Sequence, residues 1–154
     1  MNDILIREAQ IADIPHIMHH RTRMYWDMGN HDEEAHRRML LSTEAFLRDA
    51  MPRGAYRAWI AEADGRVIGG AGVTIVAWAG SPDDPAPRRG WIQNVYTEPE
   101  FRRRGLAQRL VDRVVEWCRK DGFVSVSLHA SDFGRPLYEK IGFRQTNEMR
   151  LRLR

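Results

Sequence analysis

Three consecutive arginines and a glycine begin an apolar helical pattern in the stretch NVYTEPEFRRRGLAQRL, residues 94–110. The arginines are Arg102, Arg103 and Arg104, and Gly105 follows them directly. The first turn of a helix has backbone N–H groups without partners and carries partial positive charge, so a glycine-containing loop before a helix suits a phosphate group. A solvated surface turn and a nucleic-acid-binding arm are the two other interpretations of these residues.

Small residues and a modest net charge favour the phosphate interpretation. Gly105 allows a ligand to approach the backbone closely, and Ala107 keeps the helix start slim. Lys+Arg of 24 against Asp+Glu of 21 leaves a net charge of only +3, which disfavours a nucleic-acid module. No G-x-x-x-x-G-K-[ST] motif is present, and Gly70 and Gly72 lack the third glycine of a dinucleotide fingerprint. We expect these two glycines to be packing positions or a bulge in a strand.

The elements before the arginine-glycine turn are predicted to be a strand, two helices and a hairpin. The strand covers residues 4–7, and the helices cover residues 13–27 and 32–51. Asp64-Gly65 joins two β-rich runs, YRAWIAEA and RVIGGAGVTIVAWAG, as a tight hairpin turn. The second run is apolar or small on both faces, which predicts a central place in the sheet.

The remaining elements alternate between strands and helices around the turn. WIQNVYT precedes it as a strand, and a helix follows that ends at Gly122. VSVSLHAS is a predicted strand, residues 134–141 a short helix, and RQTNEMRLRLR a strand with one solvent-facing side. The order β-α-α-β-β-β-α-β-α-β predicts one α/β domain, residues 1–154, with a mixed central sheet and about four flanking helices.

Other potentially reactive residues have simpler explanations. The single cysteine, Cys118, cannot form an internal disulfide and lies in an apolar helical row, which predicts a buried thiol. His16, His19 and His20 have metal-compatible spacing but no H-E-x-x-H motif, so we interpret them as surface histidines and predict no metal site. No apolar run is long enough for a leader or a membrane span, so we expect a cytoplasmic protein without a membrane partner.

The turn and a second segment resemble the signature motifs of the GNAT superfamily of N-acetyltransferases. Residues 102–107 match the pattern Q/R-x-x-G-x-G/A, and a strand with Thr97-Glu98-Pro99 precedes them. The later segment LHASDFGRPLYEKIGFRQ resembles the family's second motif, a strand, a short helix bearing a tyrosine, and a Gly-Phe pair. The resemblance implies a sheet with two splayed strands and acetyl-CoA as co-substrate.

The resemblance also implies roles for individual residues. The pantetheine arm and thioester would meet the backbone of Val95, Tyr96 and Thr97, and Ser131 would make a weak contact with the cofactor arm. The pyrophosphate would lie on the turn and helix start, where the signature selects Arg102 at its first position: Arg102, Arg103, Arg104, Gly105, Leu106 and Ala107.

The chemistry implied by the resemblance is direct attack of an amine on the thioester in a ternary complex. A backbone N–H near Val95 would donate to the oxyanion, and Tyr138 would act as general acid toward the CoA thiolate. A packed helix aromatic is the other interpretation of Tyr138. Glu98 and His129 are two candidates for a general base, which remains unassigned because many similar enzymes use a chain of water molecules.

The acceptor is expected to be a small-molecule or peptide amine, with no nucleic-acid partner. The end of the first long helix would shape its pocket, although core packing explains the same apolar residues: Met24, Tyr25, Trp26 and Met28. Four acidic residues there would attract a cationic amine: Asp27, Asp32, Glu33 and Glu34. The last three of them equally suit the start of a helix. The resemblance makes a homodimer possible, and the final strand or apolar helix residues are the two candidates for its interface. A non-catalytic acyl-CoA-binding or regulatory domain is the alternative function.

Overall fold

The computed structural model describes residues 3–154, and its elements follow the predicted order as far as the last helix. The chain forms five strands, four α-helices and two short 3-10 helices within this range: β1 (Leu5–Glu8), η1 (Ile11–Asp13), α1 (Ile14–Asp27), α2 (Glu33–Ala50), β2 (Tyr56–Ala63), β3 (Arg66–Ala77), β4 (Arg88–Thr97), η2 (Pro99–Phe101), α3 (Leu106–Lys120), β5 (Val126–Ser127) and α4 (Arg135–Ile141).

The sheet has the strand order β1-β2-β3-β4-β5, so the predicted central position of β3 is confirmed. All neighbouring strands are antiparallel except β4 and β5, which run parallel. Asp64 and Gly65 both adopt left-handed backbone angles, with φ of 51° and 74°, which is the geometry that a two-residue hairpin turn requires. The chain therefore reverses tightly between β2 and β3, as the Asp-Gly pair predicts.

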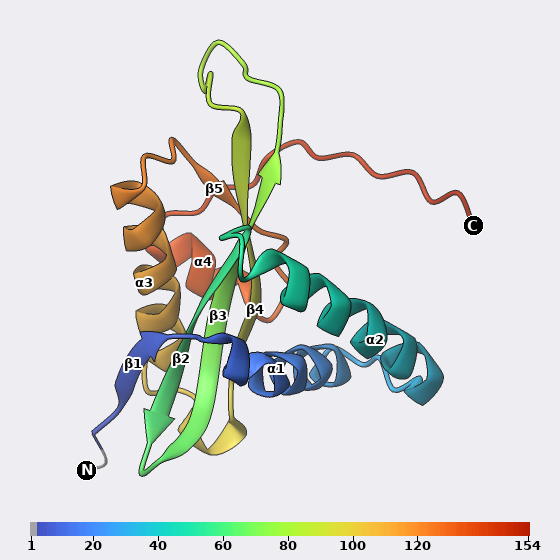
Figure 1. Ribbon diagram of the computed structural model, residues 1–154, viewed down its shortest axis with the longest axis vertical. Helices are drawn as coiled ribbons and strands as arrows, with labels where there is room; N and C mark the ends of the chain where they lie inside the picture. Colours follow the sequence, from blue (N-terminus) through green and yellow to red (C-terminus); the bar gives the residue numbers. More distant parts are fainter. Residues whose placement is uncertain (1–2) are drawn as a thin grey trace.

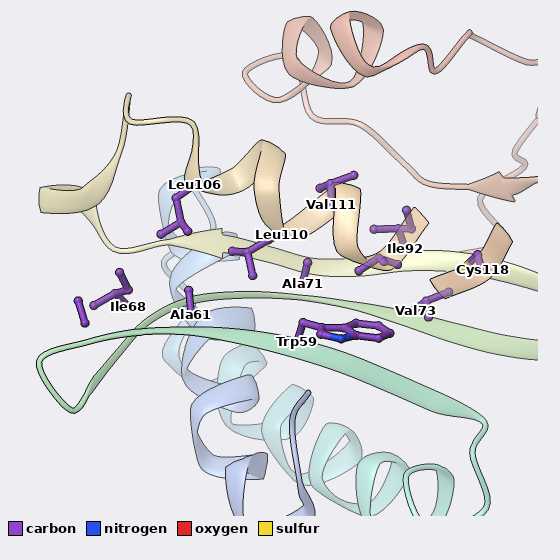
Figure 2. Close-up of a cluster of buried hydrophobic side chains, with 12 residues drawn as sticks. Trp59, Ala61, Ile68, Ala71, Val73, Ile92, Leu106, Leu110, Val111 and Cys118 are labelled. Atoms are coloured by element: carbon purple, nitrogen blue, oxygen red, sulfur yellow. The ribbon is translucent and has the colours of Figure 1, made fainter. Parts of the chain in front are cut away.

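Helices cover the two faces of the sheet separately (Figure 1). On one face α3 buries its apolar side against β2, β3 and β4 (Figure 2). The short helix α4 lies beside α3 (Figure 1). On the other face α1 and α2 enclose a smaller core with the first residues of β2. Successive residues of β2 point to opposite faces, so Ala58 joins the core under α1 and α2, and Trp59 joins the core under α3.

The thiol of Cys118 is buried, as the sequence predicts. Cys118 is buried in the core under α3, and burial raises the pKa of its thiol to about 11. The thiolate is therefore disfavoured, as expected of a structural cysteine.

None of the helices within residues 3–154 combines the length and the apolar character needed to cross a bilayer.

The last predicted strand differs in the structure. Residues 143–154 belong to no helix or strand, and the end of the chain runs away from the body of the molecule (Figure 1). The preceding strand is also shorter than VSVSLHAS, because β5 pairs with β4 only at Val126 and Ser127. Alternating apolar and charged residues favour extended backbone, but a strand also needs a neighbour with which to form hydrogen bonds.

Candidate active site

The parallel strands β4 and β5 separate after two pairs of residues. Gly90 lies opposite Val126 and Trp91 opposite Ser127, and no other strand among residues 3–154 pairs with the rest of β4 on that side. The edge of β4 from Ile92 to Tyr96 therefore presents backbone groups that can pair with an extended ligand, whereas the carbonyl oxygen of Thr97 already accepts a hydrogen bond from Arg102. The predicted backbone contacts Val95, Tyr96 and Thr97 all lie on this separated half of β4.

A β-bulge changes the direction of the β4 backbone at the point of separation. The pairing with β3 passes from Gly72 opposite Gln93 to Gly70 opposite Tyr96, so Asn94 and Val95 together lie opposite one residue. Asn94 adopts a left-handed φ of 58°, which is uncommon for a residue other than glycine. The prediction of packing positions or a bulge at Gly70 and Gly72 is confirmed, with the extra residue on the β4 side of the pair. A bulge bends its strand, so the backbone around Val95 is redirected.

The arginine-glycine turn leaves the N-terminus of α3 open. Gly105 is the N-cap residue with a left-handed φ of 74°, and no side chain within residues 3–154 caps the first turn of the helix. By contrast, Asp32 caps α2 by accepting a hydrogen bond from the N–H of Ala35. The unpaired N–H groups at the start of α3 and the partial positive charge there favour an anion. Arg103 and Arg104 are exposed beside this helix start.

Arg102 is directed toward α1. Its Nε donates to the carbonyl oxygen of Thr97 at 2.8 Å, and its Nη2 donates to Oδ2 of Asp27 at 2.7 Å. The guanidinium also lies over the ring of Tyr96, 5.4 Å from its centroid. These contacts attach the turn to the ends of β4 and α1. Asp27 was predicted to attract a cationic amine, but its carboxylate is already paired with Arg102.

We predict that Arg102 orders the turn through Asp27. The pair is about one-third exposed on each side, so replacing Arg102 with Gln should raise the Kd for acetyl-CoA only about threefold to fivefold. Asp27→Asn should have a similar effect, and the double variant should be no weaker than either single one. Isothermal titration calorimetry on the four proteins gives this cycle. If Arg102 instead held the pyrophosphate, Arg102→Gln would weaken binding more than tenfold and Asp27→Asn would not.

A chain of hydrogen-bonded polar side chains crosses the face of the bulge. These contacts were not predicted from the sequence. Arg21 of α1 donates from Nη1 to Oδ1 of Asn94 at 2.8 Å, and Nδ2 of Asn94 donates to the hydroxyl of Tyr56 at 2.9 Å. Gly72 makes room for this chain, because an added Cβ there would lie 2.1 Å from the Tyr56 hydroxyl oxygen. An asparagine and paired glycines inside otherwise apolar strands are the sequence signal for this arrangement.

Arg21 has the least compensated charge near the bulge. Its Nε is buried without a hydrogen-bond partner among residues 3–154, and no carboxylate in that part of the chain forms a salt bridge with it. The aromatic ring of Tyr25 lies 5.3 Å from the guanidinium carbon. A half-buried cation with a spare donor therefore faces the same region as the redirected backbone of β4.

His20 is buried, so its interpretation as a surface histidine is wrong. Only 2% of the residue is exposed, and its ring stacks on Tyr96 with 5.4 Å between ring centroids. Burial lowers the pKa of His20 to about 3, with smaller contributions from His19 and His16. β4 packs against the side of α1 that carries His20, and this contact buries the ring. No group of three potential metal ligands occurs among the described residues.

We predict that His20 makes the fold less stable in acid. Its folded-state pKa lies below the usual 6.5, so between about pH 6.5 and 3 the unfolded chain binds a proton that the folded chain excludes. This one group should lower the free energy of unfolding by about 1.4 kcal/mol for each pH unit within that window. Urea unfolding at pH 6, 5 and 4 should show a flatter profile for His20→Phe, whereas exposed His16→Phe should keep the original slope. Parallel profiles for His20→Phe and the unchanged protein would contradict the assignment.

The two candidates for a general base are both engaged in other contacts. Oε1 of Glu98 lies 2.8 Å from Nε2 of His19, and its Oε2 accepts a hydrogen bond from the Tyr96 hydroxyl at 3.3 Å. His129, beyond β5, pairs with Glu148 and lies against Trp91. Neither arrangement directs a free base toward the separated half of β4.

Tyr138 lies on α4, which packs next to α3. Its ring is half-buried, 5.8 Å from that of Phe143, and Gly134 leaves room for it, because an added Cβ would lie 3.1 Å from the ring. The hydroxyl forms no hydrogen bond within residues 3–154, and burial raises the pKa of Tyr138. The phenol thus keeps its proton at neutral pH. Ser131 has a local partner, since its Oγ accepts a hydrogen bond from the N–H of Gly134 at 3.1 Å.

The apolar residues at the end of α1 are only partly assembled into a pocket. Trp26 packs against His31 at 4.3 Å between ring centroids, whereas Met28 is 56% exposed. A separate groove of about 440 Å³ lies between α1 and α2 and contains none of these residues. Its lining comes from the earlier turns of α1 and the middle of α2: Ile14, Pro15, Met18, His19, Thr22, Leu40, Glu44 and Arg48.

Separated parallel strands, a bulge at their fork and a helix start without a side-chain cap after a glycine turn therefore lie at one end of the sheet. The model of the acetyltransferase (GNAT) family matches residues 16–143. The chain therefore belongs to the GNAT acetyltransferase family. Acetyl transfer from acetyl-CoA is the general activity of that family.

Solved structures and a curated relative support this assignment. A GCN5-related N-acetyltransferase from Ralstonia eutropha JMP134 is 29% identical, with a TM-score of 0.92 over 98% of this chain and 99% of that one. A predicted acetyltransferase from Clostridium acetobutylicum, solved with acetyl-CoA, is 28% identical, with a TM-score of 0.90 over 98% and 97%. A glucosamine 6-phosphate N-acetyltransferase from Trypanosoma brucei brucei is 34% identical over 58% of each chain. The chain spans between 38% and 58% of the length of the curated relatives it matches.

Proposed function

We propose that this protein transfers the acetyl group of acetyl-CoA to a primary amine by direct attack in a ternary complex. The observation that carries this proposal is the separation of β4 from β5 beside the uncapped N-terminus of α3. An extended pantetheine arm can pair with the free edge of β4, and a pyrophosphate can bind the first turn of α3. The bound acetyl-CoA in the relative from Clostridium acetobutylicum supports the same co-substrate for this chain.

Different groups of the site stabilise the developing charge and transfer the proton. The amine nitrogen attacks the thioester carbonyl, and the N–H of Val95, at the bulge, donates to the oxyanion that develops. As the C–S bond breaks, the hydroxyl of Tyr138 gives its proton to the departing thiolate. The attacking nitrogen loses its own proton to water or to a group of the acceptor. No carboxylate of the site is assigned this last step, because Glu98 is engaged by His19.

The positive charge of Arg21 affects which class of acceptor amine the site would favour. A cation without a carboxylate partner lowers the pKa of an ammonium ion bound near it, which favours the neutral amine that attacks. It also repels polycations and suits an acceptor with a carboxylate or phosphate near its amine. We therefore propose a small amine that bears an anionic group, with Arg21 holding that group.

Binding of acetyl-CoA and its fragments tests the cofactor site. In isothermal titration calorimetry, acetyl-CoA and CoA should bind with similar Kd values, because both carry the pantetheine arm and the pyrophosphate. S-acetylpantetheine, which lacks the pyrophosphate, should bind at least about 30-fold more weakly, since it forgoes the charged hydrogen bonds at α3. Equal affinity for all three molecules would show that the start of α3 is not the pyrophosphate site. A lack of binding by acetyl-CoA would contradict the proposal entirely.

A further inference from the structure

Within residues 3–154, the groups that contact the Arg21 guanidinium carry no negative charge. Its Nη1 donates to the amide oxygen of Asn94 at 2.8 Å, and the ring of Tyr25 lies 5.3 Å from its central carbon. Two carboxylates of α1 and of the end of β4 have other partners: Asp27 pairs with Arg102, and Glu98 pairs with His19. The charge of Arg21 is therefore not neutralised on the face of the bulge.

The side-chain amide of Asn94 has only one orientation that satisfies its neighbours. A guanidinium donates hydrogen bonds and accepts none, so the atom that faces Arg21 must be the amide oxygen. The amide nitrogen then faces Tyr56 and donates to its hydroxyl at 2.9 Å. Only 6% of Asn94 and 2% of Tyr56 are exposed, so water competes little for these hydrogen bonds. The amide therefore holds Arg21 in place without adding a charge.

Packing and backbone geometry at position 94 do not themselves require an uncharged side chain. The left-handed φ of 58° favours asparagine and aspartate among the residues other than glycine. An aspartate has the same shape as Asn94 and could accept hydrogen bonds from both Arg21 and the hydroxyl of Tyr56. Tyr56 cannot supply the negative charge itself, because burial raises its pKa to about 12 and the phenol stays neutral. The choice of the amide at position 94 therefore sets the charge of this part of the site.

We propose, resting on the transferase function proposed above, that Asn94 determines which charge the acceptor carries beside its reacting amine. Asn94 is a positioning residue, because its amide orients Arg21 and leaves the charge of that guanidinium for an anionic group of the acceptor. Asn94 directly precedes Val95, whose N–H is assigned to the oxyanion, so this charge lies beside the reaction centre. An aspartate at position 94 would pair with Arg21 and remove the preference for an anionic acceptor.

Two small amines of similar length, β-alanine and 1,3-diaminopropane, test this role because they differ in the charge of the second group. The ratio of their kcat/KM values measures the preference, and effects common to both amines cancel in it. The unchanged protein should favour β-alanine by about 30-fold, as expected for one charge acting over several ångströms. Asn94→Asp and Arg21→Gln should each bring the ratio to within about threefold of one. The double variant, which leaves a net negative charge, should favour 1,3-diaminopropane.

Asn94→Gly is the control for a purely structural role. Glycine accepts the left-handed φ and removes both side-chain hydrogen bonds, but it leaves Arg21 charged. This variant should lower kcat/KM for both amines and still favour β-alanine.

The outcomes separate this role of Asn94 from the transferase function. If neither amine nor any other acceptor releases CoA thiol, the transferase function is contradicted, and the role of Asn94 is overturned with it. If thiol is released but Asn94→Asp keeps the ratio of the unchanged protein, only the role of Asn94 is overturned. Equal losses of kcat/KM for both amines in Asn94→Asp would show that Asn94 is a structural residue alone. An Asn94→Asp protein that does not melt cooperatively would contradict the claim that position 94 accepts either side chain.

Discussion

Replacing Ala107 with aspartate is expected to weaken acetyl-CoA binding about 100-fold while leaving the fold intact. Ala107 is the second residue of α3, two positions after the N-cap residue Gly105. Two like charges about 6 Å apart repel each other by about 2.8 kcal/mol at an effective dielectric constant near 20, which corresponds to a loss of about 100-fold in affinity. The Kd should be measured by calorimetry, with thermal unfolding measured in parallel.

Thermal unfolding shows whether Ala107→Asp weakens binding of acetyl-CoA without unfolding the protein. A carboxylate in the first turn interacts favourably with the helix dipole, so Ala107→Asp should keep or slightly raise the melting temperature. Ala107→Asn is the matched control, because it has nearly the same size without the charge, and it should weaken binding only a few-fold. Equal losses for Asp and Asn would attribute the effect to size. Unchanged binding by Ala107→Asp would remove the start of α3 from the cofactor site.

Replacing Tyr138 with phenylalanine is expected to lower kcat about 10-fold to 100-fold, with less than a threefold change in KM for acetyl-CoA. The substitution removes only the hydroxyl that donates a proton to the CoA thiolate, and general acid catalysis contributes effects of this order or larger. The ring packing against Phe143 is retained, so the fold should be unaffected. Steady-state kinetics with a saturating amine separate the two constants.

The pH dependence of kcat and a second tyrosine provide controls for this prediction. Burial raises the pKa of Tyr138 above its usual value of 10, so its acid function should persist to at least pH 9 in the unchanged protein. Tyr96→Phe removes the hydroxyl that bonds to Glu98 and should change kcat less than threefold. Similar losses of kcat for both variants, or unchanged turnover by Tyr138→Phe, would show that Tyr138 is a packed aromatic residue and not the acid.

Local sequence signals account for most of the fold and for the position of the site. The Asp64-Gly65 hairpin and the helix after Gly105 follow from backbone preferences that act within a few residues. The same is true of β3, whose two apolar faces indicate burial on both sides whatever its neighbours are. These elements bring the arginine-glycine turn to the end of a strand, which is the part of the site that the resemblance to the GNAT superfamily also identified.

Pairings between distant residues could not be read from the sequence. The partner of Arg102 is Asp27, 75 residues away, and the partner of Asn94 is Arg21 on α1. His20 is buried because β4 packs on one particular side of α1, a choice that the spacing of three histidines does not reveal. The alternating residues 149–154 indicate a strand in the same way, but alternation specifies a conformation and not the neighbour with which it pairs.

Amine-dependent release of CoA from acetyl-CoA tests the central proposal most directly. Free thiol should be followed with carboxylate-bearing and phosphate-bearing amines, with aminoglycosides, polyamines and peptides, and the acetylated product should be identified by mass spectrometry. We predict thiol release that requires an amine, matches the acetylated product one to one, and is fastest for small amines with an anionic group. Arg21→Gln should remove that preference. Tight binding of acetyl-CoA without release by any of these amines would contradict a transferase and favour a non-catalytic acyl-CoA-binding domain.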